Sequence, residues 1–104
     1  MRKKAKIRWT TRASDDLREA KIIIALDKPK AAVKYVRNLK ESVNDLSLFP
    51  FLGSAVEELG DPEILEIPFK SHRIIYRFDG KRVIIIRVFH AARNLGMRDI
   101  EESD

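Results

Sequence analysis

The feature that most constrains the fold is a pair of alternating apolar segments within residues 71–90, joined by Asp79-Gly80. An Asp-Gly pair between two such segments is typical of a β-hairpin with a two-residue type I′ turn, because both residue types tolerate the positive φ angles that this turn requires. The sequence therefore predicts an antiparallel hairpin in which Phe78 lies opposite Lys81.

In this register, Arg73 and His90 lie on the same face of the hairpin, at the end away from the turn. His72 lies on the other face, opposite Arg87. Because the two histidines of the chain are then on different faces and the chain contains no cysteine, we expect no metal site and no other cofactor.

The predicted hairpin carries arginines among its apolar residues. Arg77 and Arg82 lie opposite each other, and like charges at such a pair destabilise a sheet unless they turn to solvent or bind an anion. An antiparallel sheet backed by helices normally has one apolar and one polar face, whereas here both faces are mixed. We therefore expect helices to cover one face and the other face to form the basic floor of a groove.

The N-terminal part of the chain predicts a strand followed by a helix. Residues 5–9 alternate weakly and predict a short strand. Thr10 or Thr11 is suited to cap the helix that follows, and Asp15 and Asp16 lie in its first turns, where the helix dipole favours negative charge. We interpret this acidic pair as structural rather than catalytic.

A second helix has the clearest periodicity in the chain. Asp27 is suited to its N-cap and Pro29 to its first turn. Apolar residues then recur at intervals of three and four, namely Ala32, Val36, Leu39, Val43 and Leu46. The short joint between the two helices predicts an antiparallel helical hairpin that ends before Pro50.

The remaining segments complete the fold class. Residues 49–62 contain two prolines and two glycines and predict a loop. Residues 63–69 predict a strand, which Pro68 places at a bulge or near a sheet edge. We therefore predict an α+β fold of order β-α-α-β-β-β, with an N-terminal helical hairpin packed on a small antiparallel sheet. From a length of 104 residues we predict one domain. It comprises residues 1–98 and is followed by an acidic tail, residues 99–104.

Composition narrows the class of protein. The net charge is +5, and residues 1–98 alone carry 21 basic and 12 acidic groups, or +9, because the last six residues hold four of the 16 acidic groups. This balance favours a polyanionic or acidic partner. The basic N-terminus lacks the apolar stretch of a signal peptide, and no apolar run approaches the roughly 20 residues of a membrane span. With no cysteine present, we expect a cytoplasmic protein without membrane association.

Five fragments of the sequence together resemble one known superfamily. They are W…A..DL at Trp9 to Leu17, P..A..Y…L at Pro29 to Leu39, L..FP..G at Leu46 to Gly53, HRIIYRF at His72 to Phe78 and VFHAARN at Val88 to Asn94. Their order and spacing resemble the RelE/ParE superfamily of small toxins from bacterial type II toxin-antitoxin pairs. The resemblance implies the same β-α-α-β-β-β domain and a cognate antitoxin whose C-terminal segment wraps the toxin.

The resemblance implies one of two activities. RelE-like members cut messenger RNA on the ribosome without a metal, whereas ParE-like members inhibit DNA gyrase. In a nuclease, the family pattern implies that Arg73 binds the scissile phosphate and that His90 is the acid or base. Glu57 or Glu58 would be the opposing carboxylate. The other arginines of this region are expected to bind a partner or an anion, namely Arg77, Arg82, Arg87 and Arg93.

Departures from the RelE-like pattern favour the ParE-like activity. The ending HAARN resembles the histidine-x-x-arginine ending of ParE-like sequences, and no tyrosine follows His90. Leu65 and Glu66 stand where many relatives have an arginine. We therefore predict a gyrase-inhibiting toxin. A ribosome-dependent endoribonuclease using Arg73 and His90 is the alternative, in which case alone the chain is an enzyme, and a plain RNA-binding module is a third interpretation. The apolar surface that an antitoxin would cover also allows self-association.

Overall fold

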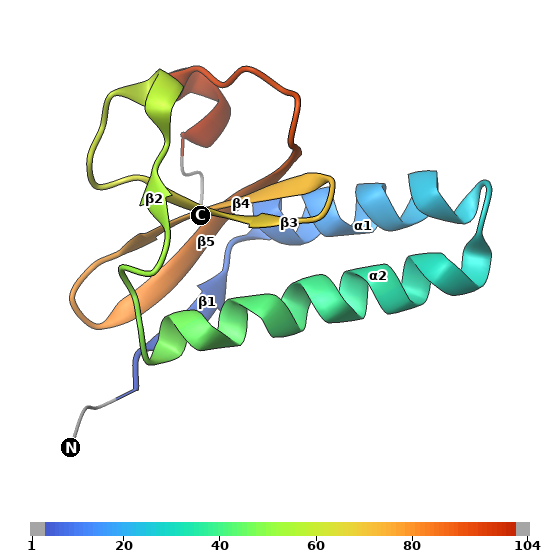
Figure 1. Ribbon diagram of the computed structural model, residues 1–104, viewed down its shortest axis with the longest axis horizontal. Helices are drawn as coiled ribbons and strands as arrows, with labels where there is room; N and C mark the ends of the chain where they lie inside the picture. The colour runs from blue at the N-terminus through green and yellow to red at the C-terminus, as the bar shows by residue number, and fades with distance from the viewer. Residues whose placement is uncertain (1–3, 102–104) are drawn as a thin grey trace.

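The computed structural model describes residues 4–101 and contains one five-stranded sheet with two helices against it (Figure 1). The strands are β1 (Lys6–Trp9), β2 (Ser54–Ala55), β3 (Leu65–Phe69), β4 (His72–Phe78) and β5 (Arg82–His90). The helices are α1 (Thr11–Ala25) and α2 (Pro29–Ser42), with 3₁₀ helices η1 (Val43–Ser47), η2 (Glu57–Leu59) and η3 (Met97–Ile100). No helix among these residues is long and apolar enough to cross a membrane.

The sheet order is β1-β5-β4-β3-β2, in which β1 runs parallel to β5 and the other neighbours are antiparallel. The predicted α+β fold, with a helical hairpin on a small sheet, is confirmed. The sheet is mixed rather than wholly antiparallel, because β1 lies beside β5 and runs parallel to it. The two helices, β2, β3 and β4 come between these two strands in the chain. The short strand β2 lies within the segment that the sequence predicts as a loop.

Thr10 begins α1 and ties it to the sheet. Its side-chain oxygen accepts a hydrogen bond from the Ala13 backbone N–H at 3.1 Å, which satisfies a donor that the first helical turn leaves unpaired. The same hydroxyl is 3.0 Å from the carbonyl oxygens of both Ile85 and Ile86, toward which it donates. The prediction of a threonine cap is confirmed at Thr10.

The second helix begins at Pro29 without a side-chain cap. Lys28 occupies the N-cap position, so the prediction that Asp27 caps this helix is wrong. Proline provides the φ angle of a helix start, and its missing N–H is one that the first turn of a helix leaves without a partner in any case. Four members of the predicted apolar series are buried, and the last two of them lie in η1: Ala32, Leu39, Val43 and Leu46.

Both faces of the sheet are covered by apolar side chains. On the helix side, Leu17 of α1 and Leu39 of α2 pack against strand residues such as Ile74. The other face carries a second cluster, which consists of Val56, Ile64, Ile75, Ile84, Ile86, Phe89, Leu95 and Ile100. In Figure 1 the C-terminal segment (red) and the β2 segment (green) lie together on the side of the sheet away from the helices. The expected basic floor is therefore wrong, because this face is a second core.

The C-terminal segment packs onto the domain up to its last described residue. Ile100 of η3 is 4% exposed within the second cluster. Arg12 of α1 donates a hydrogen bond to the Glu101 carbonyl oxygen at 2.6 Å. The expected start of an acidic tail at residue 99 thus falls inside η3, and residues 102–104 of that tail lie outside the described residues.

The hairpin turn is centred one residue later than the sequence predicts. Phe78 pairs with Val83 rather than with Lys81, and Gly80 has a positive φ of 95°. The Asp79 carboxylate accepts hydrogen bonds from two backbone N–H groups of the turn, at 2.9 and 2.7 Å. An aspartate that bonds the backbone two and three residues ahead stabilises this later turn in place of the predicted type I′ turn.

A bulge in β5 then changes which side chains share a face. One extra residue, Ile86, is inserted between the pairs on either side of it. Because side chains alternate along a strand, one extra residue moves the rest of β5 to the opposite face. His72 now pairs with His90, whereas Arg73 pairs with Phe89. The predictions that Arg73 and His90 share a face, and that the two histidines do not, are wrong.

The observed register also separates two arginines that were expected to face each other. Arg77 pairs with Ile84, and Arg82 forms an ion pair with Asp79 at 3.3 Å. The predicted repulsion between Arg77 and Arg82 across the hairpin is therefore absent from the observed pairing.

Tyr76 fixes the loop that precedes β2. Its buried hydroxyl donates to the Pro50 carbonyl oxygen at 2.8 Å and accepts from the Gly53 N–H at 2.9 Å. A Cβ atom on Gly53 would lie 2.5 Å from the Glu66 carbonyl oxygen and 2.8 Å from the Tyr76 hydroxyl. Glycine is required at this position because of these close approaches.

We expect Gly53→Ala to lower the free energy of unfolding by about 1–3 kcal/mol, because neither the sheet carbonyl nor the buried ring can move away. Urea denaturation followed by circular dichroism measures the change. Gly96→Ala is the matched control, since the nearest atom to its added Cβ is 4.0 Å away. Equal unfolding midpoints for the two variants would contradict the packing described for Gly53.

Candidate functional site

Arg73 is the centre of an ion-pair network on the sheet face away from the helices. Its Nε and Nη2 donate to the Glu66 carboxylate at 2.7 and 3.0 Å. Its Nη1 and Nη2 donate to the Glu58 carboxylate at 2.8 and 2.9 Å, and Nη1 also donates to the Arg93 carbonyl oxygen at 2.9 Å. These bonds use all five N–H donors of the guanidinium group.

The partners of Arg73 come from three separate segments. Glu66 lies on β3, which pairs with the strand that carries Arg73. Glu58 lies in η2, and Arg93 lies in the segment after β5. Glu58 also accepts a hydrogen bond from the Leu95 backbone N–H at 3.2 Å. The network therefore fastens the segment before β3 and the C-terminal segment to the centre of the sheet.

The charges in this network stabilise one another. Hydrogen bonds to Glu58 and Glu66 raise the pKa of Arg73 above its usual range, and the bonds from Arg73 lower the pKa of Glu58 to about 2. The Arg73 side chain is 12% exposed. In this arrangement its donors face two carboxylates and a carbonyl of the protein, whereas the family pattern of a nuclease implies that they face a phosphate. Two carboxylates were predicted to oppose Arg73 in a nuclease. Glu57 is exposed in η2, whereas Glu58 accepts hydrogen bonds from Arg73.

His90 lies on the other face, beside the helical hairpin. Its ring centroid is 6.0 Å from that of His72, and the Nδ1 atom of His72 is 2.8 Å from the Tyr35 hydroxyl of α2. Burial, followed by the repulsion of His90, lowers the pKa of His72, which favours the neutral imidazole at pH 7. The three side chains border a groove of about 490 Å³ that also contains Ile23 and Ile24 of α1.

Arg87 and Arg93 bind carboxylates of the protein itself. Arg87 donates to Asp16 of α1 at 2.8 and 2.9 Å and to the Asp99 carbonyl oxygen at 2.7 Å. Arg93 pairs with the Asp99 carboxylate at 2.6 Å. Both guanidinium groups lie over the Phe89 ring, at 4.4 and 4.7 Å from its centroid. Asp16 therefore binds Arg87 rather than lying in the first turn of α1 at the helix dipole, and an anion would have to displace these carboxylates.

Sequence reasoning does not identify Glu66 as a partner of Arg73, although the β3–β4 pairing places the two on one face. It also does not identify Tyr35 and His72 as neighbours of His90, because the bulge that brings the histidines together has no sequence signal of its own. No cluster of three histidine, aspartate or glutamate side chains that could hold a metal ion occurs among residues 4–101.

Solved structures share this arrangement of two antiparallel helices on a mixed sheet. A structure described as the chromosomal ParDE toxin-antitoxin system from P. aeruginosa matches with a TM-score of 0.72 and 21% identity, covering 83% of this chain and 95% of that chain. The toxin-antitoxin complex RelBE2 from Mycobacterium tuberculosis matches with a TM-score of 0.58 and 23% identity, covering 84% and 98%.

The family follows from the sequence match. A family model described as the ParE toxin of the type II toxin-antitoxin system parDE matches residues 7–95. The chain belongs to this family, and the resemblance to the RelE/ParE superfamily is confirmed. A comparison with curated proteins finds no significant match.

We expect Arg73→Lys to lower the free energy of unfolding by about 2–4 kcal/mol, because lysine keeps the charge but cannot bond two carboxylates and a carbonyl at once. Chemical denaturation measures this loss. Arg18→Lys is the control, since Arg18 pairs with Asp15 while their side chains are 70% and 57% exposed. We expect the control to change stability by less than about 0.5 kcal/mol. Similar losses in both variants would contradict a central role for Arg73.

The network should also make the fold sensitive to acid through Glu58. Its pKa is lowered to about 2 from the usual 4.5, so the stabilisation is complete above pH 4.5 and is lost as the pH falls toward 2. We expect Glu58→Gln to be less stable than the parent chain at pH 7 and to approach it near pH 2. Urea midpoints measured across this range test the sign. A stability difference that stays constant with pH would rule out the ionised Glu58 carboxylate as its source.

Proposed function

We propose that this chain arrests bacterial growth by inhibiting DNA gyrase and is neutralised by a cognate antitoxin. Membership of the ParE toxin family supports this activity. The observation that carries the proposal is that all five N–H donors of Arg73 bind groups of the protein. Arg73 is therefore not directed at a phosphate in the way that the nuclease alternative requires. Metal-independent RNA cleavage needs a cation aimed at the phosphate beside its acid and base, and Arg73 and His90 lie on different faces of the sheet.

Exposed apolar side chains support an antitoxin as the partner. They occur on the helical hairpin and in the loop after η1, namely Ile22, Ile23, Leu26, Val33, Phe49, Phe51 and Leu52. Surfaces of this kind mark protein interaction sites. Both solved structures of similar fold are described as a toxin-antitoxin system or complex. Self-association through the same surface stays a prediction. Because gyrase and the ribosome both act in the cytoplasm, we place the protein there.

Ribosome-dependent cleavage of messenger RNA is the alternative, and one observation favours it. His72 and His90 face each other at 6.0 Å between ring centroids, and Tyr35 binds His72. Two imidazoles in one groove are suited to acid-base catalysis. In this alternative His90 keeps its predicted role, but the cation for the phosphate would have to come from a residue other than Arg73.

Induction of the chain alone in a tightly controlled bacterial strain distinguishes the two activities. DNA supercoiling and protein synthesis are measured together over the first minutes, for the parent chain and for His90→Ala. We expect early loss of supercoiling or cleaved DNA while translation continues, and the same result for His90→Ala, because His90 is exposed and outside the core.

Lys30→Ala, a substitution of another exposed residue, is the control for expression and folding. Early translation arrest with intact DNA would overturn the proposal in favour of the nuclease. In that case His90→Ala should reduce the rate of cleavage on the order of a hundredfold, as expected for the loss of an acid-base group.

A further inference from the structure

We infer that a groove at the tip of the β4–β5 hairpin binds single-stranded nucleic acid. This basic-aromatic groove is lined by side chains from β1, the loop after η1 and the hairpin, among them Lys4, Lys6, Phe51, Phe78, Lys81 and Arg82. It is separate from the Arg73 network and from the histidine groove. The inference does not rest on the proposed function.

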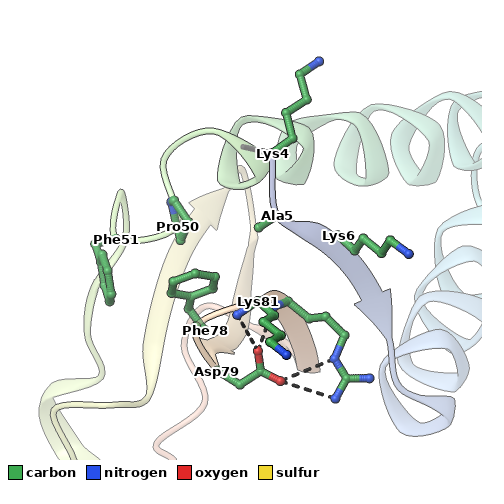
Figure 2. Close-up of a pocket in the computed structure, with 10 residues that line it drawn as sticks. Lys4, Ala5, Lys6, Pro50, Phe51, Phe78, Asp79 and Lys81 are labelled. Carbon is green, nitrogen blue, oxygen red and sulfur yellow. Dashed lines mark hydrogen bonds and ion pairs between the residues drawn. The ribbon is translucent and has the colours of Figure 1, made fainter. Parts of the chain in front are cut away.

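The geometry of the groove combines an accessible aromatic ring with cations. Phe51 is 73% exposed, and its ring meets that of Phe78 nearly at right angles, with 5.5 Å between their centroids. In Figure 2 the two rings lie near each other, Lys81 lies beside Phe78, and the side chains of Lys4 and Lys6 extend away from the rings. The space measures about 800 Å³, within the size of small-ligand sites, which is about 300–1,000 Å³.

The charge of the groove is positive. Its only lining carboxylate among the described residues is Asp79, and that group pairs with Arg82 at 3.3 Å and accepts the backbone N–H groups of the turn. Lys4, Lys6 and Lys81 are exposed and remain as the cations available to a ligand. A polyanion is therefore the ligand that this set of charges recognises.

The aromatic lining selects a single strand over other polyanions. Bases stack on accessible aromatic rings while lysines bind the phosphates of the same strand, and this pairing of contacts tolerates any base sequence. A duplex keeps its bases stacked inside and would offer only phosphates to the lysines. The rest of the apolar lining is Pro50 and Ala5, so the two phenyl rings are the flat apolar surfaces that the groove offers.

Fluorescence anisotropy with labelled oligo(dT) and oligo(U) tests the inference on the purified full chain. If each of the three lysines neutralises one phosphate, the logarithm of the association constant should fall with the logarithm of salt concentration with a slope of about −2. Phe51→Ala should weaken binding by about tenfold or more through loss of stacking. Lys6→Ala combined with Lys81→Ala should reduce the slope by about 1.4.

Matched controls keep the test specific. Phe49→Ala removes a 55% exposed phenyl ring of the same loop that does not line the groove, and Lys30→Ala with Lys34→Ala removes two exposed charges of α2. We expect both controls to bind as the parent chain does. Circular dichroism confirms that each variant is folded.

The DNA and RNA probes should bind with similar affinity, because phenyl rings and lysines contact base faces and phosphates rather than the ribose 2′-hydroxyl. Absence of binding at low salt would overturn the inference, as would equal losses in the groove variants and the controls. Equally tight binding of a duplex would overturn the stacking role of Phe51. None of these outcomes depends on gyrase, so the inference and the proposed function fail independently.

Discussion

The bonds of Arg73 hold the second face of the sheet together. Glu58 of η2, Glu66 of β3 and a carbonyl of the C-terminal segment all meet one guanidinium group. These segments close over an apolar cluster that includes Leu95 and Ile100. A mostly buried guanidinium is stable only when each donor has a partner, because an unpaired charge away from water is costly. The loop before β3 and the segment after β5 are therefore fastened by the same residue.

Several arginines of the sheet and of the segment after it are used in ion pairs within the protein. Arg73, Arg82, Arg87 and Arg93 each pair with a carboxylate of the protein. Arginine suits this role because its planar fork bonds two oxygens at once, whereas lysine is a strongly hydrated point charge. Lysines accordingly surround the exposed groove at the hairpin tip. The basic composition is thus partly used in internal ion pairs, and the exposed lysines are charges that these pairs leave open to a partner.

The bulge in β5 decides which side chains of the candidate site lie on the same face of the sheet. The family pattern supplies Arg73 and His90 as residues, but the extra residue Ile86 puts them on different faces. Arg73 joins an ion-pair network with a structural role, and His90 joins His72 and Tyr35 beside the helices. The same family motif is therefore compatible with a stable scaffold without an assembled nuclease site. A pattern of residue types carries no information about which side of the sheet each side chain occupies.

The sequence by itself determined the α+β class, the helical hairpin, a threonine cap at Thr10 or Thr11 and the superfamily, because periodicity, capping and motif spacing are local properties. Only the tertiary structure decided the parallel pairing of β1 with β5, the bulge at Ile86 and the second core beneath the C-terminal segment. These depend on contacts between residues far apart in the chain. The partners of Arg73 illustrate the limit, since Glu58 and Arg93 reach it only after the chain has closed over both faces of the sheet.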